Sequence, residues 1–291
     1  MNTYFDVFVN GYVGYFNYLT NEILNPSWHN YFYWLLGLSL FVWLLELAFP
    51  WREEQAIFRR DFWLDGFYMF FNFFVFSLVI YNAVSNVAVS LFNDFLFNVF
   101  GISNIVSVSV AALPTWVQWL TLFVARDFIQ WNVHRLFHSN PFLWSFHQVH
   151  HSIEQMGFAG HFRYHWGETI VYRTLEYVPL AMIGFGIDDF FVVHMFTLAV
   201  GHLNHANINL RLGVFKYIFN NPQMHIWHHA KELPNAKGAN FGLTLSLWDY
   251  LFKTAYIPSN GKDIKLGFGQ VETFPHRFWQ QMKYPFQKKK R

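Results

Sequence analysis

The chain has 291 residues, of which 54% are hydrophobic and 22% aromatic, but only 13% are charged. Soluble domains carry about 25% charged residues, so this composition indicates a membrane protein. The formal net charge of +2 suggests no nucleic-acid partner, and the absence of cysteine excludes disulfides, thiolate metal sites and cysteine nucleophiles. Any bound metal must therefore be held by nitrogen and oxygen atoms.

The N-terminal part of the chain predicts a short surface segment followed by a membrane span. Residues 1–30 are polar and aromatic, and we expect them to lie at the membrane interface. The first basic residue is Arg52, so the basic region of a cleavable signal peptide is missing. Residues 31–49 form an apolar run that, at about 1.5 Å per residue, nearly crosses a hydrocarbon core of about 30 Å.

Three further apolar stretches follow along the chain. Residues 66–92 predict a second span, residues 93–113 a loop with some surface-lying structure, and Pro114 the start of a third span. Residues 169–200 are too long for one span, and we expect a hairpin that turns at residues 184–187. A soluble all-α protein with buried helices is the alternative, which the length of these runs disfavours.

The positions of the basic residues test this arrangement. Residues 1–51, 61–125 and 174–210 contain no lysine or arginine, so every basic residue falls in or close to the segments on one side of the membrane. By the positive-inside rule that side is the cytoplasm. We therefore expect an all-α membrane protein with about four transmembrane helices and a cytoplasmic helical cap. The K-K-K-R end suits a lipid-headgroup contact or an endoplasmic-reticulum retrieval signal.

The strongest chemical signal is a series of regularly spaced histidines. Residues three and four apart share one face of a helix, so each H-x-x-x-H or H-x-x-H-H group points its imidazoles one way. Asn140-Pro141 breaks the helix between the first two groups, which can then fold back toward each other. Neutral imidazole is the commonest metal ligand in proteins, and this many exceeds the need of one ion. The sequence therefore predicts a two-metal site built from His134, His138, His147, His150, His151, His225, His228 and His229.

Carboxylates near these clusters could orient the imidazoles. A metal-bound imidazole usually donates its other N–H to a carboxylate or carbonyl oxygen. Four acidic residues lie close in sequence to the clusters, namely Asp127, Glu154, Glu168 and Asp249. Each could equally cap a helix or pair with one of the nearby arginines, Arg126, Arg135 and Arg163.

The order of these motifs resembles the fatty acid hydroxylase/sterol desaturase family of integral-membrane, histidine-rich di-iron oxygenases. The resemblance covers residues 123–256 and includes D-F-I-Q-W-N-V-H-R-L-F-H, W-S-F-H-Q-V-H-H-S, R-Y-H-W-G-E, N-P-Q-M-H-I-W-H-H-A and W-D-Y-L-F-K-T. Family members often show H-P where this chain has His165-Trp166, and F-G-T where it has Phe252-Lys253-Thr254. The resemblance implies two iron ions, O2 and an external electron donor, with no catalytic residue beyond the metal ligands.

The remaining histidines are weighed by position and by this resemblance. His205 follows the last apolar run and is a predicted ligand, as is His165. For His161 we expect a structural role or a contact to a ligand, whereas His202 could either contact a ligand or be one. His194 sits within an apolar run, where a hydrogen bond to a neighbouring helix is the simplest interpretation.

The function implied is O2-dependent hydroxylation or desaturation of a long-chain lipid or sterol drawn from the bilayer. No fused haem, flavin or iron–sulfur signature is present, so a separate electron-transfer protein or reductant would supply electrons. We expect a multi-pass protein of the bacterial inner membrane or endoplasmic reticulum, with an N-terminal transmembrane region at residues 1–113. A catalytic region at residues 114–256 and a basic tail at residues 257–291 would follow.

Three other functions are open on these residues. An ether-lipid, alkylglycerol-type monooxygenase of the same family would take its electrons from tetrahydrobiopterin. A membrane metal transporter or metal-binding protein would place its ligands along the spans at mid-membrane, whereas these histidines cluster at the cytoplasmic ends. An inactive scaffold is disfavoured because the histidine set is complete.

Overall fold

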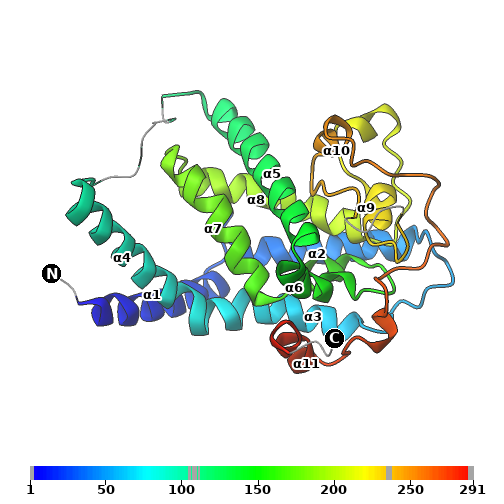
Figure 1. Cartoon of the computed structure of the whole chain (residues 1–291), viewed down its shortest axis with the longest axis horizontal. Coiled ribbons are helices and arrows are strands. Elements are labelled where there is room, and N and C mark those ends of the chain that lie inside the picture. Colours follow the sequence, from blue (N-terminus) through cyan, green and yellow to red (C-terminus); the bar gives the residue numbers. More distant parts are fainter. Residues whose placement is uncertain (1–2, 104–105, 107–109, 111, 234–237, 288–291) are drawn as a thin grey trace.

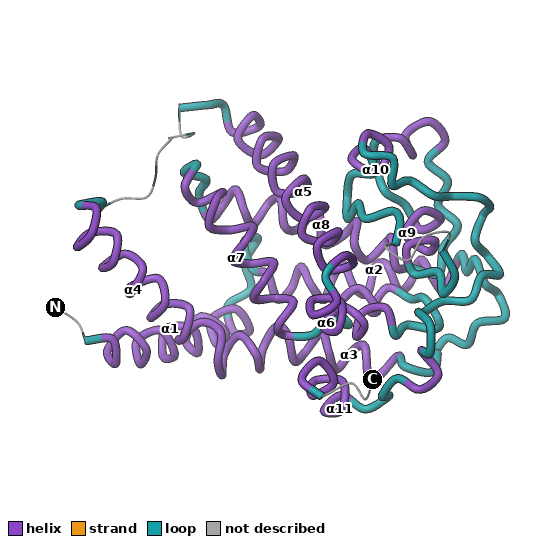
Figure 2. The backbone as a smooth tube through the Cα atoms, viewed as in Figure 1, coloured by secondary structure: helices purple, strands orange, loops and turns teal. Residues whose placement is uncertain are grey.

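The computed structural model describes residues 3–103, 106, 110, 112–233 and 238–287. Within these ranges all regular elements are helices, joined by loops and a few isolated β-bridges (Figure 1). The predicted all-α fold is confirmed. The long helices lie on one side of the molecule, and the longest loops gather at the end that carries α9, Pro222–His228, and α10, Leu247–Leu251 (Figure 2).

The first helix, α1, spans Tyr4–Leu24 and occupies most of the segment expected at the interface. It begins with a capping box, in which the Thr3 hydroxyl accepts from the Asp6 amide at 3.2 Å and the Asp6 carboxylate accepts from the Thr3 amide at 2.8 Å. Helix α2, Tyr31–Ala48, begins in turn at Asn30, whose side chain accepts from a backbone amide. Its bounds agree with the first predicted span.

The second apolar stretch is helical for longer than expected. It consists of α3, Phe62–Phe70, a π-helical segment η1, Phe71–Tyr81, and α4, Asn82–Phe100, which packs against α1. The prediction that a loop begins at residue 93 was wrong, because no helix breaker occurs before Gly101. That glycine ends α4 in the left-handed conformation, at φ 69°. Part of the predicted loop lies outside the described residues.

Among the described residues, three helical stretches are long and apolar enough to cross a membrane, namely Tyr31–Ala48, Phe62–Val79 and Asn82–Phe100. Little of their surface is covered by the protein itself, and only 6% of the last of these is buried. Phenylalanine, leucine and valine side chains therefore face outward over this region, as expected where lipid is the solvent.

The third apolar stretch forms α5, Thr115–Ser139, and the fourth forms α7, Trp166–Met182, and α8, Ile187–His205. The chain turns between α7 and α8 at the place predicted for the hairpin. Both helices pack against α5. Buried Arg126 joins these three helices, because its guanidinium donates to Glu176 on α7 at 2.5 Å and to Thr197 on α8 at 2.9 Å.

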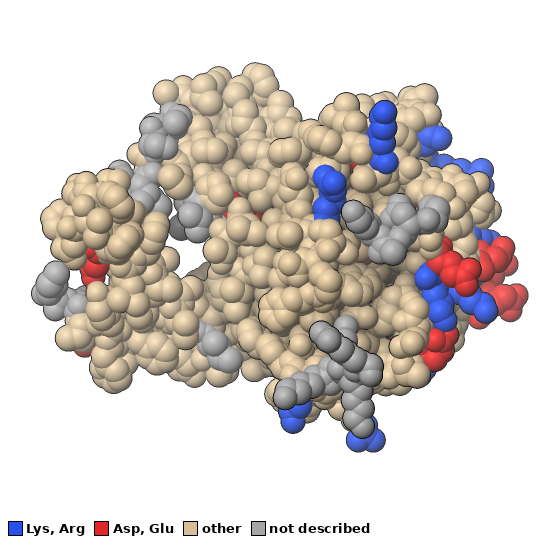
Figure 3. All heavy atoms as spheres, viewed as in Figure 1, with Lys and Arg blue, Asp and Glu red and all other residues tan. Residues whose placement is uncertain are grey.

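The remaining short elements form a cap over one end of the long helices. They are α6, Pro141–His151, η2, Phe158–Phe162, η3, Gly213–Tyr217, η4, Val271–Thr273, α11, Phe278–Lys283, and η5, Tyr284–Phe286, together with α9 and α10. On the face shown in Figure 3, charged side chains gather mostly at this end, and the rest is almost free of them. On this face the cap therefore carries most of the charged side chains.

Candidate metal centre

Nine of the ten predicted ligands meet in two adjoining groups. The first group is His134, His138, His147, His151 and His228, and the second is His150, His205, His225 and His229. Within each group the candidate ligand atoms all lie within 4.8 Å of one another. All but His138 are fully buried, and His138 is half-buried. The two groups are neighbours, because the rings of His151 and His229 stack at 4.5 Å.

Both short helices that carry the H-x-x-H-H pattern begin with an asparagine N-cap followed by proline. The Asn140 side chain accepts from the Phe142 amide at 2.9 Å and caps α6, and Pro141 follows at the first helical position. Asn221 caps α9 in the same way, again followed by proline. The predicted break between the first two histidine groups is confirmed, and it lets α6 turn its histidines back toward those of α5.

Backbone carbonyls fix the orientation of several imidazoles. An imidazole that donates from Nδ1 presents its lone pair at Nε2, and a carbonyl at Nδ1 selects that tautomer. Four rings are held in this way by carbonyls from other parts of the chain or from the preceding turn. The pairs are His134 with Phe241 at 2.8 Å, His228 with Ala239 at 2.8 Å, His205 with Gly201 at 2.8 Å, and His150 with Arg163 at 3.2 Å.

The facing nitrogens have the spacing that a shared ion requires. Imidazole nitrogens bind such ions at about 2.1 Å, so two ligands at right angles lie about 3 Å apart. The Nε2 atoms of His134 and His147 lie 3.0 Å apart, as do those of His205 and His225. In the first group, Nε2 of His138, His151 and His228 is buried without any hydrogen-bond partner. The arrangement of these nitrogens suits binding to metal ions better than it suits hydrogen bonds between the imidazoles.

Burial also keeps these imidazoles in the form that binds metal. Desolvation, assisted by repulsion from neighbouring imidazoles, holds the pKa of His147, His151, His225, His228 and His229 well below the usual value of 6.5. Burial lowers the pKa of His150 to about 3. The rings are therefore neutral at pH 7, and a cation meets no proton competition for their lone pairs.

One of the four predicted carboxylates contacts a ligand imidazole directly. Buried Glu168, at the start of α7, accepts from Nδ1 of His147 at 2.9 Å. Asp249 is connected to a ligand imidazole indirectly, through Phe241. Its carboxylate accepts from the Phe241 amide at 2.9 Å, and the Phe241 carbonyl in turn accepts from Nδ1 of His134. The other two carboxylates contact no ligand ring, because Asp127 binds the Thr244 and Leu245 amides and Glu154 pairs with Arg60.

Substituting Glu168 should weaken metal binding through His147. We expect Glu168→Ala to lower metal affinity about 10- to 100-fold, because His147 loses the acceptor that fixes its tautomer and ring orientation. Glu168→Gln should cost less, since its amide oxygen can still accept from Nδ1. Metal retention against a chelator, measured on purified protein, separates the two variants. Equal retention in the wild type and in Glu168→Ala would contradict this role.

Four histidines weighed in the sequence lie outside both groups, namely His161, His165, His194 and His202. His165, a predicted ligand, has both ring nitrogens engaged with backbone, since Nε2 donates to the Met282 carbonyl at 2.9 Å and Nδ1 accepts from the Gly167 amide at 2.9 Å. His202 bonds through Nε2 to the Ser39 hydroxyl at 3.1 Å. His194 accepts from Arg126 at 3.2 Å, which agrees with the expected hydrogen bond to a neighbouring helix.

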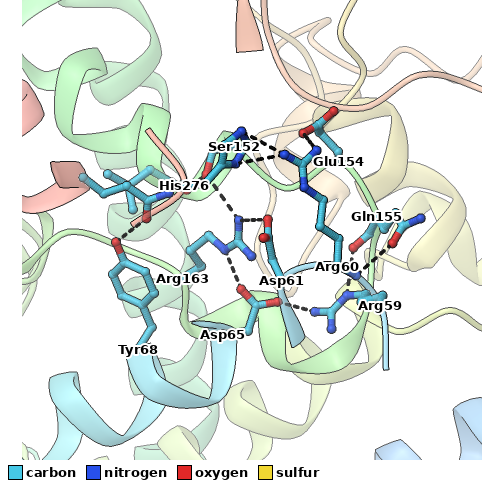
Figure 4. Close-up of polar contacts among 12 residues, drawn as sticks. Arg59, Arg60, Asp61, Asp65, Tyr68, Ser152, Glu154, Gln155, Arg163 and His276 are labelled. Atoms are coloured by element: carbon cyan, nitrogen blue, oxygen red, sulfur yellow. Dashed lines mark hydrogen bonds and ion pairs between the residues drawn. The ribbon is translucent and has the colours of Figure 1, made fainter. Parts of the chain in front are cut away.

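No motif in the sequence indicates the ion-pair network that supports this centre. Figure 4 shows Asp65 between the guanidinium groups of Arg59 and Arg163, with Asp61 on the other side of Arg163. Arg163 is 1% exposed and Asp65 is fully buried. Because the Arg163 carbonyl holds His150, this network ties the start of α3 to the second group. Arg163 lies 98 residues from Asp65 in the sequence, so no motif could reveal their contact.

Comparisons with known proteins agree with this geometry. The family model described as fatty acid hydroxylase matches residues 119–254. The chain is 32% identical to ornithine lipid hydroxylase OlsE of Rhizobium tropici, over 61% of this chain and 53% of the relative. It is also 32% identical to alkylglycerol monooxygenase of Xenopus tropicalis, over 50% of this chain and 32% of the relative.

A more distant relative is very-long-chain aldehyde decarbonylase GL1-10 of Oryza sativa subsp. japonica, which is 24% identical over 47% of this chain and 46% of its own. The chain thus spans about half or less of the length of these relatives. No solved structure matches it. The matched region contains every residue of both histidine groups. Residues 119–254 therefore match the fatty acid hydroxylase family, and this match includes the whole candidate centre.

Proposed function

We propose that this protein is a membrane-embedded, non-haem di-iron oxygenase that hydroxylates or desaturates the hydrocarbon part of a lipid or sterol with O2. The observation that carries this proposal is the meeting of nine neutral imidazoles, eight of them buried, in two adjoining groups. The names of the relatives, a lipid hydroxylase and a monooxygenase, support the same class of reaction.

In this proposal each group binds one ion. The first group would hold one ion with His134, His138, His147, His151 and His228, and the second would hold the other with His150, His205, His225 and His229. Imidazole suits iron as well as zinc, copper and nickel, so the choice of iron rests on the family. The two metal ions would supply the activation of O2 that side chains alone cannot provide. His165 is left out of this ligand set because both its nitrogens are already bonded.

The protein's own residues would hold these ligands and exclude water. Carbonyls and Glu168 fix the tautomers, so the lone pairs converge before a metal arrives. Packing around the centre is dense: Phe241 contacts His134 and His138, and Trp144 contacts His138 and His151. Such a dry shell protects a reactive intermediate from water and keeps a hydrocarbon substrate in place.

We further propose that the centre lies on the cytoplasmic face and receives its substrate from the bilayer. The cap carries most of the charge on the face drawn in Figure 3, and the apolar segments at residues 31–49 and 66–92 carry no basic residues. A lipid or sterol then reaches the metal without leaving the membrane. A separate protein or small reductant would donate the electrons.

A second candidate is an ether-lipid oxygenase. It is favoured by the similarity to alkylglycerol monooxygenases of three vertebrates, which are 29% to 32% identical to this chain. Lipid profiles of cells with and without the gene distinguish the two: loss of hydroxylated or unsaturated acyl or sterol species supports the first. Cleavage of alkylglycerols that depends on tetrahydrobiopterin supports the second.

Metal analysis tests the requirement of this proposal that two iron ions bind. Purified protein should contain about two irons per chain, because paired histidine groups of this kind each hold one ion. Chelation should abolish product formation with reductant and O2, and ferrous iron should restore it. Protein with intact histidines that binds one ion or none would contradict the pair. A protein that holds iron yet consumes no O2 with reductant and membrane lipid would favour an inactive scaffold.

A further inference from the structure

His161 lies beside the second histidine group although it is not part of it. Its ring is 5.3 Å from that of His205, whereas His229, which belongs to the group, has its ring 5.4 Å from His205. Nδ1 of His161 is buried and has no hydrogen-bond partner. An imidazole in such a place needs a partner that the surrounding protein does not provide.

The two groups differ by one ligand. Five histidines surround the first position and four surround the second. Iron sites of nitrogen and oxygen ligands accept up to six donors, so the second position has room for another. Among the described histidines outside the groups, His165 has both ring nitrogens bonded to backbone and His194 bonds to Arg126. His202 bonds to Ser39 through Nε2, while its Nδ1 is buried without a partner; no ring contact with a histidine of either group is seen for it, whereas His161 contacts His205.

Helix α8 is shaped to admit the His161 ring. A Cβ atom at Gly201 would lie 2.3 Å from both Cε1 and Nε2 of His161, so only glycine leaves space for the ring there. The Gly201 carbonyl also accepts from Nδ1 of His205 at 2.8 Å. Glycine inside a helix is unfavourable, so its presence calls for a packing reason. One turn of α8 thus orients a ligand and makes room for a neighbouring imidazole.

On its other side the ring is supported by His202. The two rings lie 5.2 Å apart at 85°, and His202 is anchored to Ser39 on α2. His161 is therefore placed between an anchored histidine and a ligand, on the short helix η2 that follows α6. Beyond η2 and His202, its ring also contacts His205 of the second group.

We infer that His161 is the fifth imidazole ligand of the second metal position. The inference rests on the proposed function, because it requires that two ions bind. His161 closes on the ion by a side-chain rotation of its own, since its nitrogens are not within the 4.8 Å set formed by the other four. The competing explanation is that His161 only fills space between α8 and η2.

A pair of substitutions separates ligation from packing. His161→Phe keeps a ring of similar size but cannot bind metal, and Gly201→Ala keeps every imidazole but displaces the His161 ring. We expect each variant to retain about one iron per chain where the wild type retains about two. His276→Phe, a change at an exposed histidine bonded to Arg60, is the matched control and should retain the wild-type amount.

Chemical rescue gives an independent measurement. His161→Gly should lose the same ion, and free imidazole added to the purified variant should restore it, with X-ray absorption showing the iron–nitrogen count of the wild type. Retention of the full iron content by His161→Phe or Gly201→Ala, or failure of imidazole to restore it in His161→Gly, would overturn the assignment. Wild-type protein without paired iron would instead overturn the proposed function, and this ligand role with it.

Discussion

Replacing His228 with alanine is expected to abolish lipid oxidation while leaving membrane insertion intact. His228 lies at the centre of the first group, with its ring 4.4 Å from that of His134 and 4.7 Å from that of His151. Its Nδ1 is held by the Ala239 carbonyl, and its Nε2 is buried without a partner. Loss of residues that only orient a ligand costs about 10- to 100-fold, so loss of a ligand itself should cost more than about 100-fold in product formation.

The measurement compares product formed per unit of folded protein in detergent or vesicles, with iron content determined on the same samples. His150→Ala should behave like His228→Ala but lose the ion of the second group. His276→Ala is the control, since that side chain is exposed and bonds to Arg60. Full activity in His228→Ala or His150→Ala would contradict their assignment as ligands.

Replacing Asp65 with asparagine is expected to destabilise the folded protein strongly. Asp65 is fully buried and neutralises two buried arginines, Arg59 and Arg163. Asparagine keeps the shape but removes the charge, which leaves Arg163 with Asp61 alone and Arg59 without an acidic partner among these contacts. Breaking such a buried pair costs about 3–5 kcal/mol, because the remaining charge stays desolvated.

Thermal unfolding of the purified protein tests this expectation. The matched control is Glu154→Gln, which breaks the exposed ion pair between Glu154 and Arg60 in the same part of the molecule. That change should cost no more than about 1 kcal/mol, because exposed pairs are screened by water. Iron retention should also fall in Asp65→Asn, since the Arg163 carbonyl holds His150. A similar loss of stability in both variants would contradict the proposed role of the network.

Sequence patterns sufficed for the helical fold and for most of the candidate centre. Spacings of three and four residues placed His147, His150 and His151 on one helical face, and Asn140-Pro141 marked where the chain turns back. These features are local, because backbone geometry alone relates residues within a turn. The hairpin of α7 and α8 was likewise predicted from the glycines in its turn.

Helix ends in the second apolar stretch were harder to predict. Residues 93–100 were expected to form a loop, yet they continue α4 to Phe100. Hydropathy indicates whether a segment prefers lipid or water, but it does not indicate the residue at which a helix ends. The stop is set by Gly101, whose left-handed conformation a side chain would disfavour.

The sequence by itself determined which residues could bind metal, and the tertiary structure decided which of them lie together. His165 has the spacing of a ligand, but its two nitrogens are taken by backbone groups of Met282 and Gly167. His161 stands four residues before His165, and Gly201 on a distant helix gives its ring a place beside His205. Contacts between segments separated by many residues depend on how whole helices pack, and spacing along one helix carries no information about that packing.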